Sequence, residues 1–131
     1  MDQTNPPTRL SGAVEKGWGY ELIWATSDDY CGKIMFFNKV GGKTSMHFHK
    51  VKDETWFVNC GRFKVRYIDT KDSAMYEKEI GEGEVWHNPP LMPHQLIALE
   101  DGSSLTEVST ADSVEDNYRI GPGDSQTDNA E

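Results

Sequence analysis

The sequence predicts an all-β domain with extended ends, and three observations support that prediction. Charged and apolar residues alternate along short stretches, as at residues 62–67, where Phe63, Val65 and Tyr67 would face inward. Glycine-containing turns separate these stretches. Apolar residues make up 36% of the 131 residues, which suits short strands with one solvated face. A chain of this length is about one domain by the usual prior.

The elements follow in order along the chain. Residues 1–15 contain Asn5-Pro6-Pro7 and no periodicity, so they are expected to be an extended arm before a single domain at residues 16–120. Residues 121–131 have the composition of a loose tail. The expected strands are residues 17–24 after a short turn, then 31–40, 44–49, 56–59, 62–69, 76–80, 94–98 and 104–109.

Prolines interrupt the pattern shortly before the last two of these strands. Residues 85–93 contain Pro89, Pro90 and Pro93. Because proline cannot donate a backbone hydrogen bond in a central strand, this segment is expected to be a loop. The loop would deliver His94, which follows it directly.

Four residues suggest a metal site. His47 and His49 are two residues apart, so in a strand both imidazoles leave one face while Met46 and Phe48 leave the other. Glu54 follows after a break long enough for a hairpin loop, and His94 lies in a second turn-rich segment. Three imidazoles and a carboxylate suit Zn²⁺, Mn²⁺, Fe²⁺, Co²⁺ or Ni²⁺, and the sequence does not choose among them.

The spacing of these residues resembles a known family. Residues 41–61 read G-x5-H-x-H-x4-E-x6-G, the first motif of the cupin superfamily. Gly83, Pro89 and His94 match the second motif, with Leu91 in place of a glycine and Ala98 in place of an asparagine. The resemblance implies a cupin-type double-stranded β-helix, also called a jelly-roll barrel, with His47, His49, Glu54 and His94 as its metal ligands.

Flanking segments narrow the resemblance to small cupins related to phosphomannose isomerases. They are W-G-Y-E-L-I-W at residues 18–24, E-V-S-T at residues 107–110 and E-D-N-Y-R at residues 115–119. A proline before the first segment and a D-D-Y-G-R ending, both common in those relatives, are absent. This resemblance implies aldose–ketose isomerisation of a sugar or sugar phosphate through a metal-stabilised enediolate. By family position, Glu107 and Lys33 are candidates for the general base, and Arg119 for the group that binds phosphate.

Two other functions stay open on the same residues. The altered second motif and the missing ending favour a non-catalytic cupin that binds or senses a sugar. A three-histidine, one-carboxylate site also supports a metal-dependent dioxygenase. Binding without turnover would identify the first, and oxygen uptake with iron or copper the second.

Charge and composition limit the partners and the compartment. A net charge of −9 disfavours nucleic acid and anionic membranes. Residues 33–66 nevertheless hold eight basic residues against two acidic ones, which favours an anionic small substrate. The chain has no apolar run of about 20 residues and no apolar region near residue 1, so a cytoplasmic protein is expected, with Cys31 and Cys60 as thiols. A small sandwich with an arm offers edges to pair, so a homodimer is expected.

Overall fold

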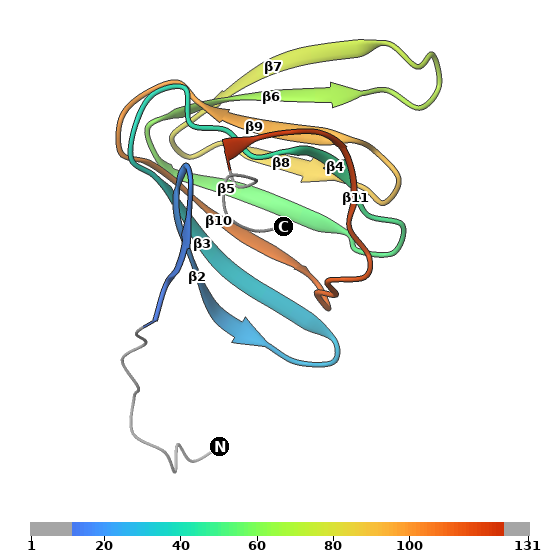
Figure 1. Cartoon of the computed structure of the whole chain (residues 1–131), viewed down its shortest axis with the longest axis horizontal. Helices are drawn as coiled ribbons and strands as arrows, with labels where there is room; N and C mark the ends of the chain where they lie inside the picture. Colours follow the sequence, from blue (N-terminus) through green and yellow to red (C-terminus); the bar gives the residue numbers. More distant parts are fainter. Residues whose placement is uncertain (1–11, 125–131) are drawn as a thin grey trace.

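Eleven strands in two antiparallel sheets form the part of the chain that the computed structural model describes, residues 12–124 (Figure 1). The larger sheet has the order β1 (Val14–Lys16), β2 (Gly19–Thr26), β3 (Tyr30–Phe37), β10 (Ser103–Thr110), β5 (Glu54–Cys60), β8 (Val85–Asn88). The smaller sheet has the order β11 (Tyr118–Gly121), β4 (Met46–Phe48), β9 (His94–Ala98), β6 (Arg62–Ile68), β7 (Met75–Gly81). The all-β prediction is confirmed.

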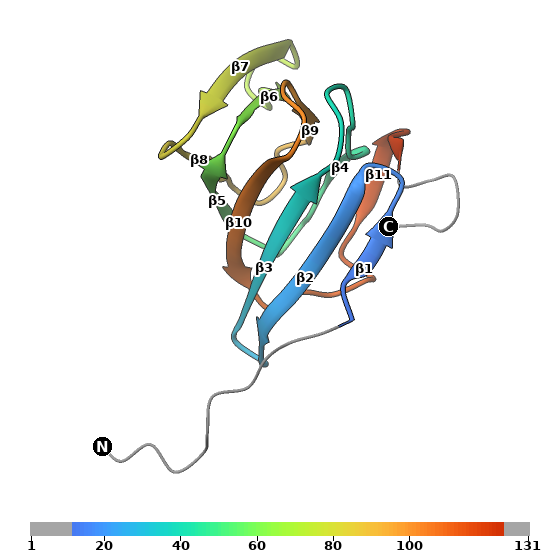
Figure 2. The same cartoon turned by 90° about the vertical axis from the view of Figure 1, so that its left-hand side faces the viewer.

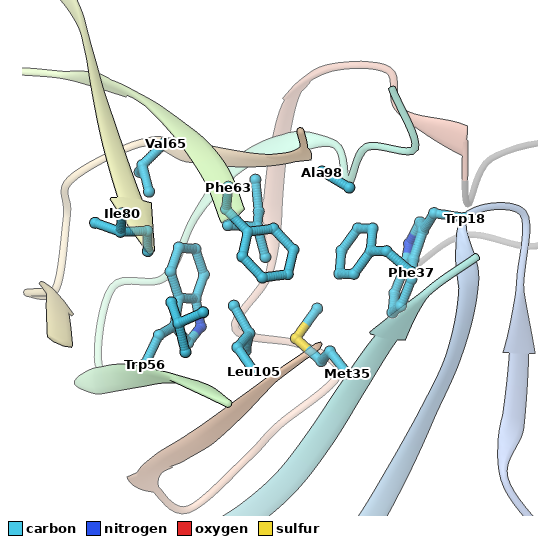
Figure 3. Close-up of a cluster of buried hydrophobic side chains, with 11 residues drawn as sticks. Trp18, Met35, Phe37, Trp56, Phe63, Val65, Ile80, Ala98 and Leu105 are labelled. Carbon is cyan, nitrogen blue, oxygen red and sulfur yellow. The ribbon is translucent and has the colours of Figure 1, made fainter. Parts of the chain in front are cut away.

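The hydrophobic core lies between the two sheets (Figure 3). Phe63 on β6 and Phe37 on β3 are fully buried and meet edge to face, with ring centroids 5.1 Å apart. The ring of Phe37 also stacks on Trp18 at 4.3 Å. Such aromatic pairs contribute about 0.5–1.5 kcal/mol each beyond the area they bury. Trp56 belongs to the same core but also stands edge-on to His94, 5.6 Å between centroids, so it separates the core from a polar region.

The turns on either side of β5 carry the chain from one sheet to the other, because β4 and β6 belong to the smaller sheet and β5 to the larger one, so the hairpin predicted between His49 and Glu54 is wrong. β5 and β6 meet at Gly61, which has a φ of 79° and whose added Cβ would lie 2.2 Å from the hydroxyl of Ser103. β4 is shorter than the predicted strand at residues 44–49, but it pairs His47 with His94 across to β9. The two histidines therefore enter the sandwich side by side.

The prediction of a loop throughout residues 85–93 is wrong for its first part. Val85–Asn88 forms strand β8, paired with β5 from Phe57 to Glu54. β8 lies at the edge of its sheet and ends just before Pro89, so no ladder hydrogen bond is lost to proline. The remaining residues, 89–93, do form the loop that leads into His94.

The ends of the described chain are tied to the sandwich. β1 pairs with β2, so residues 14 and 15 of the expected arm belong to the sheet. At the other end, the backbone N–H of Asp124 donates to the carbonyl of Lys43, and the N–H of Lys43 donates to a carboxylate oxygen of Asp124. Residues 1–11 of the expected arm and 125–131 of the expected tail lie outside the described residues.

Two smaller expectations concern thiols and membranes. Cys31 and Cys60 are both free thiols, Cys31 buried and Cys60 exposed. Between residues 12 and 124 there is no helix with the length and apolar character needed to cross a bilayer.

Candidate metal centre

Three histidines converge at the mouth of the sandwich. His47 comes from β4, His49 lies just beyond the end of that strand, and His94 is the first residue of β9. One nitrogen from each of the three rings lies within 4.8 Å of the other two. The ring centroid of His47 lies 4.7 Å from that of His94 and 5.1 Å from that of His49. The predicted meeting of residues from two distant turns is therefore present.

Backbone carbonyls orient all three rings in the same way. Each imidazole donates its Nδ1–H to a carbonyl oxygen, which directs the lone pair to Nε2. The acceptors are Ser45 for His47 at 3.0 Å, Asp116 for His49 at 2.5 Å and Met92 for His94 at 3.0 Å. Hydrogen bonds of this kind fix the tautomer of metal-binding histidines and raise their basicity.

Nε2 of His94 and Oε1 of Glu54 are among the buried polar atoms that make no hydrogen bond within the described chain. A buried polar atom without a partner costs about 1–3 kcal/mol. Burial lowers the pKa of His94 to about 4, so the ring is neutral at pH 7, the form that binds a metal. A cation at the centre of the triad would satisfy both atoms, and the donor set fits a divalent metal.

Glu54 lies beside two of the histidines. Its Oε1 is 3.2 Å from Nε2 of His49 and 3.8 Å from Nε2 of His94. Burial alone would raise the pKa of this carboxyl, but the neighbouring His49 and the ammonium of Lys52 hold it at about 2. The carboxylate is therefore ionised and directed at the triad, as the predicted fourth ligand would be.

The triad opens onto a cavity of about 330 Å³. This volume is within the roughly 300–1,000 Å³ typical of small-ligand sites. Polar and charged side chains line much of it, among them Lys33, His47, His49, Lys52, Glu54 and Glu107.

A buried ionic cluster forms the wall next to the triad. Nζ of Lys52 is 3.1 Å from Oε2 of Glu107 and 3.2 Å from a carboxylate oxygen of Asp112. Nζ of Lys33 lies 3.8 Å from the same oxygen of Glu107, and Trp56 donates its indole N–H to the other Glu107 oxygen at 3.0 Å. Burial would lower the pKa of Lys52, but Glu107, Glu54 and Asp112 raise it above its ordinary range. Lys52 is therefore charged although it is buried.

The three candidate catalytic residues taken from family position, Lys33, Glu107 and Arg119, do not all lie at the cavity. Lys33 and Glu107 both reach the cavity. Arg119 is opposite His47 in the pairing of β11 with β4, but its side chain is exposed and is not among those that line the cavity. The structure thus brings two of the three to the metal centre.

Two contributors were not found from the sequence. Lys52 appears as one more charge in the run K-V-K-D-E, and nothing in that run distinguishes it from the exposed Lys50. Asp116 lies in the E-D-N-Y-R segment, where the resemblance singled out the arginine. Its carboxylate accepts the backbone N–H groups of Lys50 at 2.7 Å, Val51 at 3.1 Å and Lys52 at 2.9 Å. One residue therefore holds both the loop between β4 and β5 and the ring of His49.

Comparison with known proteins supports this picture of the fold. No family model matches the sequence. Oxalate decarboxylase OxdC of Bacillus subtilis (strain 168) is 29% identical over 79 residues, which are 60% of this chain and 20% of that protein. A solved structure of Bacillus subtilis oxalate decarboxylase at pH 4.6 covers 83% of this chain with a TM-score of 0.74 and 23% identity. This chain spans only 30% of that structure.

A solved structure close to this chain in size has the same fold. KdgF from Halomonas sp. covers 80% of this chain and is itself covered over 90% of its length, with a TM-score of 0.69 and 18% identity. The two antiparallel sheets thus form the predicted jelly roll. The narrower resemblance to phosphomannose isomerases stays a prediction. The shared fold and the converging histidines agree with what the resemblance to the cupin superfamily implies.

Proposed function

We propose that this chain is a metal-dependent enzyme that interconverts the aldose and ketose forms of a small sugar or sugar phosphate. The observation that carries the proposal is the shared cavity, in which His47 and His49 of the triad lie beside Glu107 and the buried, charged Lys52. Proton transfer between neighbouring carbons needs a polarised carbonyl and a carboxylate close to it.

The triad and Glu54 supply the polarising group. A divalent cation held by His47, His49, His94 and Glu54 would act as a Lewis acid on the carbonyl and hydroxyl oxygens of the sugar. Three lysines line the same cavity, Lys16, Lys33 and Lys52, together with four acidic residues, Glu21, Glu54, Glu107 and Asp112. A divalent cation at the triad would therefore make the cavity positive overall, which favours an anionic ligand.

Glu107 is the proposed base. It would take the proton from the carbon that bears the hydroxyl group and return it to the neighbouring carbonyl carbon. The hydroxyl proton moves to the former carbonyl oxygen, with Lys52 as the proposed relay, so the product is an isomer of the substrate. The indole N–H of Trp56 holds one oxygen of Glu107, and the ammonium groups of Lys52 and Lys33 lie against the other.

A second candidate is decarboxylation of a small carboxylic acid, favoured by the similarity to oxalate decarboxylase. In this reaction the bond to the carboxylate carbon breaks, carbon dioxide leaves, and a proton is added to the remaining carbon. Glu107 and Lys52 would deliver that proton. The cations of the cavity suit a carboxylate as well as a phosphate.

The test is turnover by metal-loaded protein in deuterated water. Aldose and ketose phosphates are offered in one panel and small mono- and dicarboxylic acids in another, with products followed by NMR and carbon dioxide by mass spectrometry. Isomerisation with deuterium at the neighbouring carbon supports the proposal, and carbon dioxide release supports the second candidate.

Variants link the outcome to the site. Glu107→Gln should keep the metal and lose turnover at least 100-fold, whereas Glu82→Gln, in an exposed turn, should behave as the wild type. Saturable binding without turnover in both panels would contradict an enzyme and identify a non-catalytic binding protein.

A further inference from the structure

The outer face of the larger sheet is apolar over five strands. Lys33 and Glu107 point into the cavity, so the residues next to them on β3 and β10 point outward. The apolar and aromatic side chains on this outer face are Tyr20, Leu22, Trp24, Tyr30, Ile34, Phe36, Phe57, Val85 and Val108. Val85, Val108, Phe57 and Trp24 are 60%, 51%, 48% and 45% exposed. In Figure 2 strands β2, β3 and β10 lie at the front, and no other labelled strand crosses them.

No aspartate, glutamate, lysine or arginine points outward from β2, β3, β10, β5 or β8 in the described chain. Charged residues make up 27% of the sequence, so about four of some fifteen outward positions would carry a charge by chance. The outer face of the smaller sheet, in contrast, carries charged side chains. There Arg62 pairs with Glu79 at 2.6 Å, and Arg66 pairs with Glu77 at 3.2 Å.

We propose that a second copy of this chain packs on the outer face of the larger sheet, giving a dimer with twofold symmetry. A net charge of −9 makes two copies repel each other wherever acidic surfaces meet. The outer face is a broad surface on which two copies can meet without opposing carboxylates, because none of the described residues that point outward from its strands is acidic. A twofold interface uses the same patch twice, and an uncharged apolar patch is complementary to itself.

The face approaches the size of a small specific interface. Five strands about 4.8 Å apart and on average about seven residues long span roughly 19 by 24 Å, or about 450 Å² for each copy. Two copies together would bury roughly 900 Å² on the strands alone, close to the roughly 1,000 Å² expected of a specific interface.

The chain's own ends are poorly suited to cover this face. Residues 1–11 read MDQTNPPTRLS and residues 125–131 read SQTDNAE. Their large apolar or aromatic side chains are only Met1 and Leu10, against nine on the outer face. A second copy presents the same nine side chains and therefore buries more apolar surface.

Light scattering coupled to size-exclusion chromatography tests this proposal on the full chain, with and without a chelator. The wild type, with a chain mass of 14.8 kDa, should run at twice that mass in both conditions. Val108→Glu introduces two facing charges near the centre of the face and should give the monomer mass with an unchanged circular dichroism spectrum. Val85→Glu, on the edge strand β8, is a second variant that disturbs folding less and should weaken the dimer at least tenfold.

A matched control is Ile120→Glu, which places the same charge on β11 of the smaller sheet at a position 54% exposed. It should remain dimeric, as should a chain lacking residues 1–11. A monomeric wild type at 100 μM overturns the proposal, and so does a dimer that survives both Val108→Glu and Val85→Glu. Because the dimer does not need metal or substrate, these outcomes are independent of the proposed reaction.

Discussion

The ammonium of Lys52 lies 3.1 Å from a carboxylate oxygen of Glu107, and both groups are buried beside the histidine triad. Lys52 also lies 4.0 Å from Glu54 and 3.2 Å from Asp112. The positive charge of Lys52 therefore compensates both Glu107, the proposed general base, and Glu54, the proposed metal ligand. A buried ion pair adds little net stability, but loss of one partner leaves the other charge uncompensated.

Lys52→Met should lower the free energy of unfolding by about 3 kcal/mol, because three carboxylates lose their shared buried partner. Urea denaturation followed by tryptophan fluorescence measures the change. The control is Lys64→Met on the outer face of β6, where the pair with Glu77 at 3.6 Å is solvent-exposed and contributes below about 1 kcal/mol. Equal losses in the two variants would contradict the role given to Lys52.

His49→Ala and Glu54→Ala should each abolish stoichiometric metal while the folded jelly roll remains. Each change removes one donor from the proposed four-ligand site. Elemental analysis after dialysis gives the metal content, and circular dichroism checks the fold. His87→Ala, which removes an exposed histidine paired with Asp53, should keep the full metal content. Retention of the metal in both His49→Ala and Glu54→Ala would disprove the ligand assignment.

Metal affinity should rise with pH across the neutral range. Burial alone would lower the pKa of His49, but the carboxylate of Glu54 and the carbonyl of Asp116 raise it above its ordinary value of about 6.5. A raised pKa means that the metal-free ring holds a proton up to a higher pH than an ordinary histidine does, and metal binding must release that proton. Calorimetry in buffers with different ionisation enthalpies counts the released protons. Affinity that stays constant between about pH 6 and 8 would be inconsistent with this coupling.

Asp116→Ala should weaken metal binding about 10–100-fold, the usual effect of losing a group that orients a ligand. The change leaves three backbone N–H groups of the β4–β5 loop without their acceptor and loosens the carbonyl that holds His49. Titration with Co²⁺, followed by its visible absorption, reports the affinity. Glu115→Ala, at the adjacent exposed position, is the control and should bind as the wild type does. If the two variants bind equally, Asp116 does not position the site.

The sequence was most informative where spacing alone determines direction. Residues two apart in an extended chain leave the same face, which predicted that His47 and His49 converge although strand β4 ends at Phe48. His94 follows a loop that its prolines require. Strand β8 was missed because prolines were taken to exclude all of residues 85–93, although they interrupt only the part after Asn88. An edge position is a property of the whole sheet, which local composition does not reveal.

The charged wall of the cavity was the hardest part to predict. Lys33 was found through family position, but Lys52 is buried only because Glu54, Glu107 and Asp112 surround it in space. The exposed side chain of Arg119 shows the converse, since a matched position in a motif does not fix where the side chain lies. Such residues depend on contacts between distant segments of the chain.

The central claim is that His47, His49, His94 and Glu54 bind one divalent ion. A crystal structure grown with Zn²⁺, with diffraction recorded on both sides of the zinc absorption edge, tests it most directly. The account predicts a single strong anomalous peak about 2.0–2.2 Å from Nε2 of each histidine and from an oxygen of Glu54. No peak at the triad, or a single peak at the exposed His87–Asp53 pair instead, would contradict it.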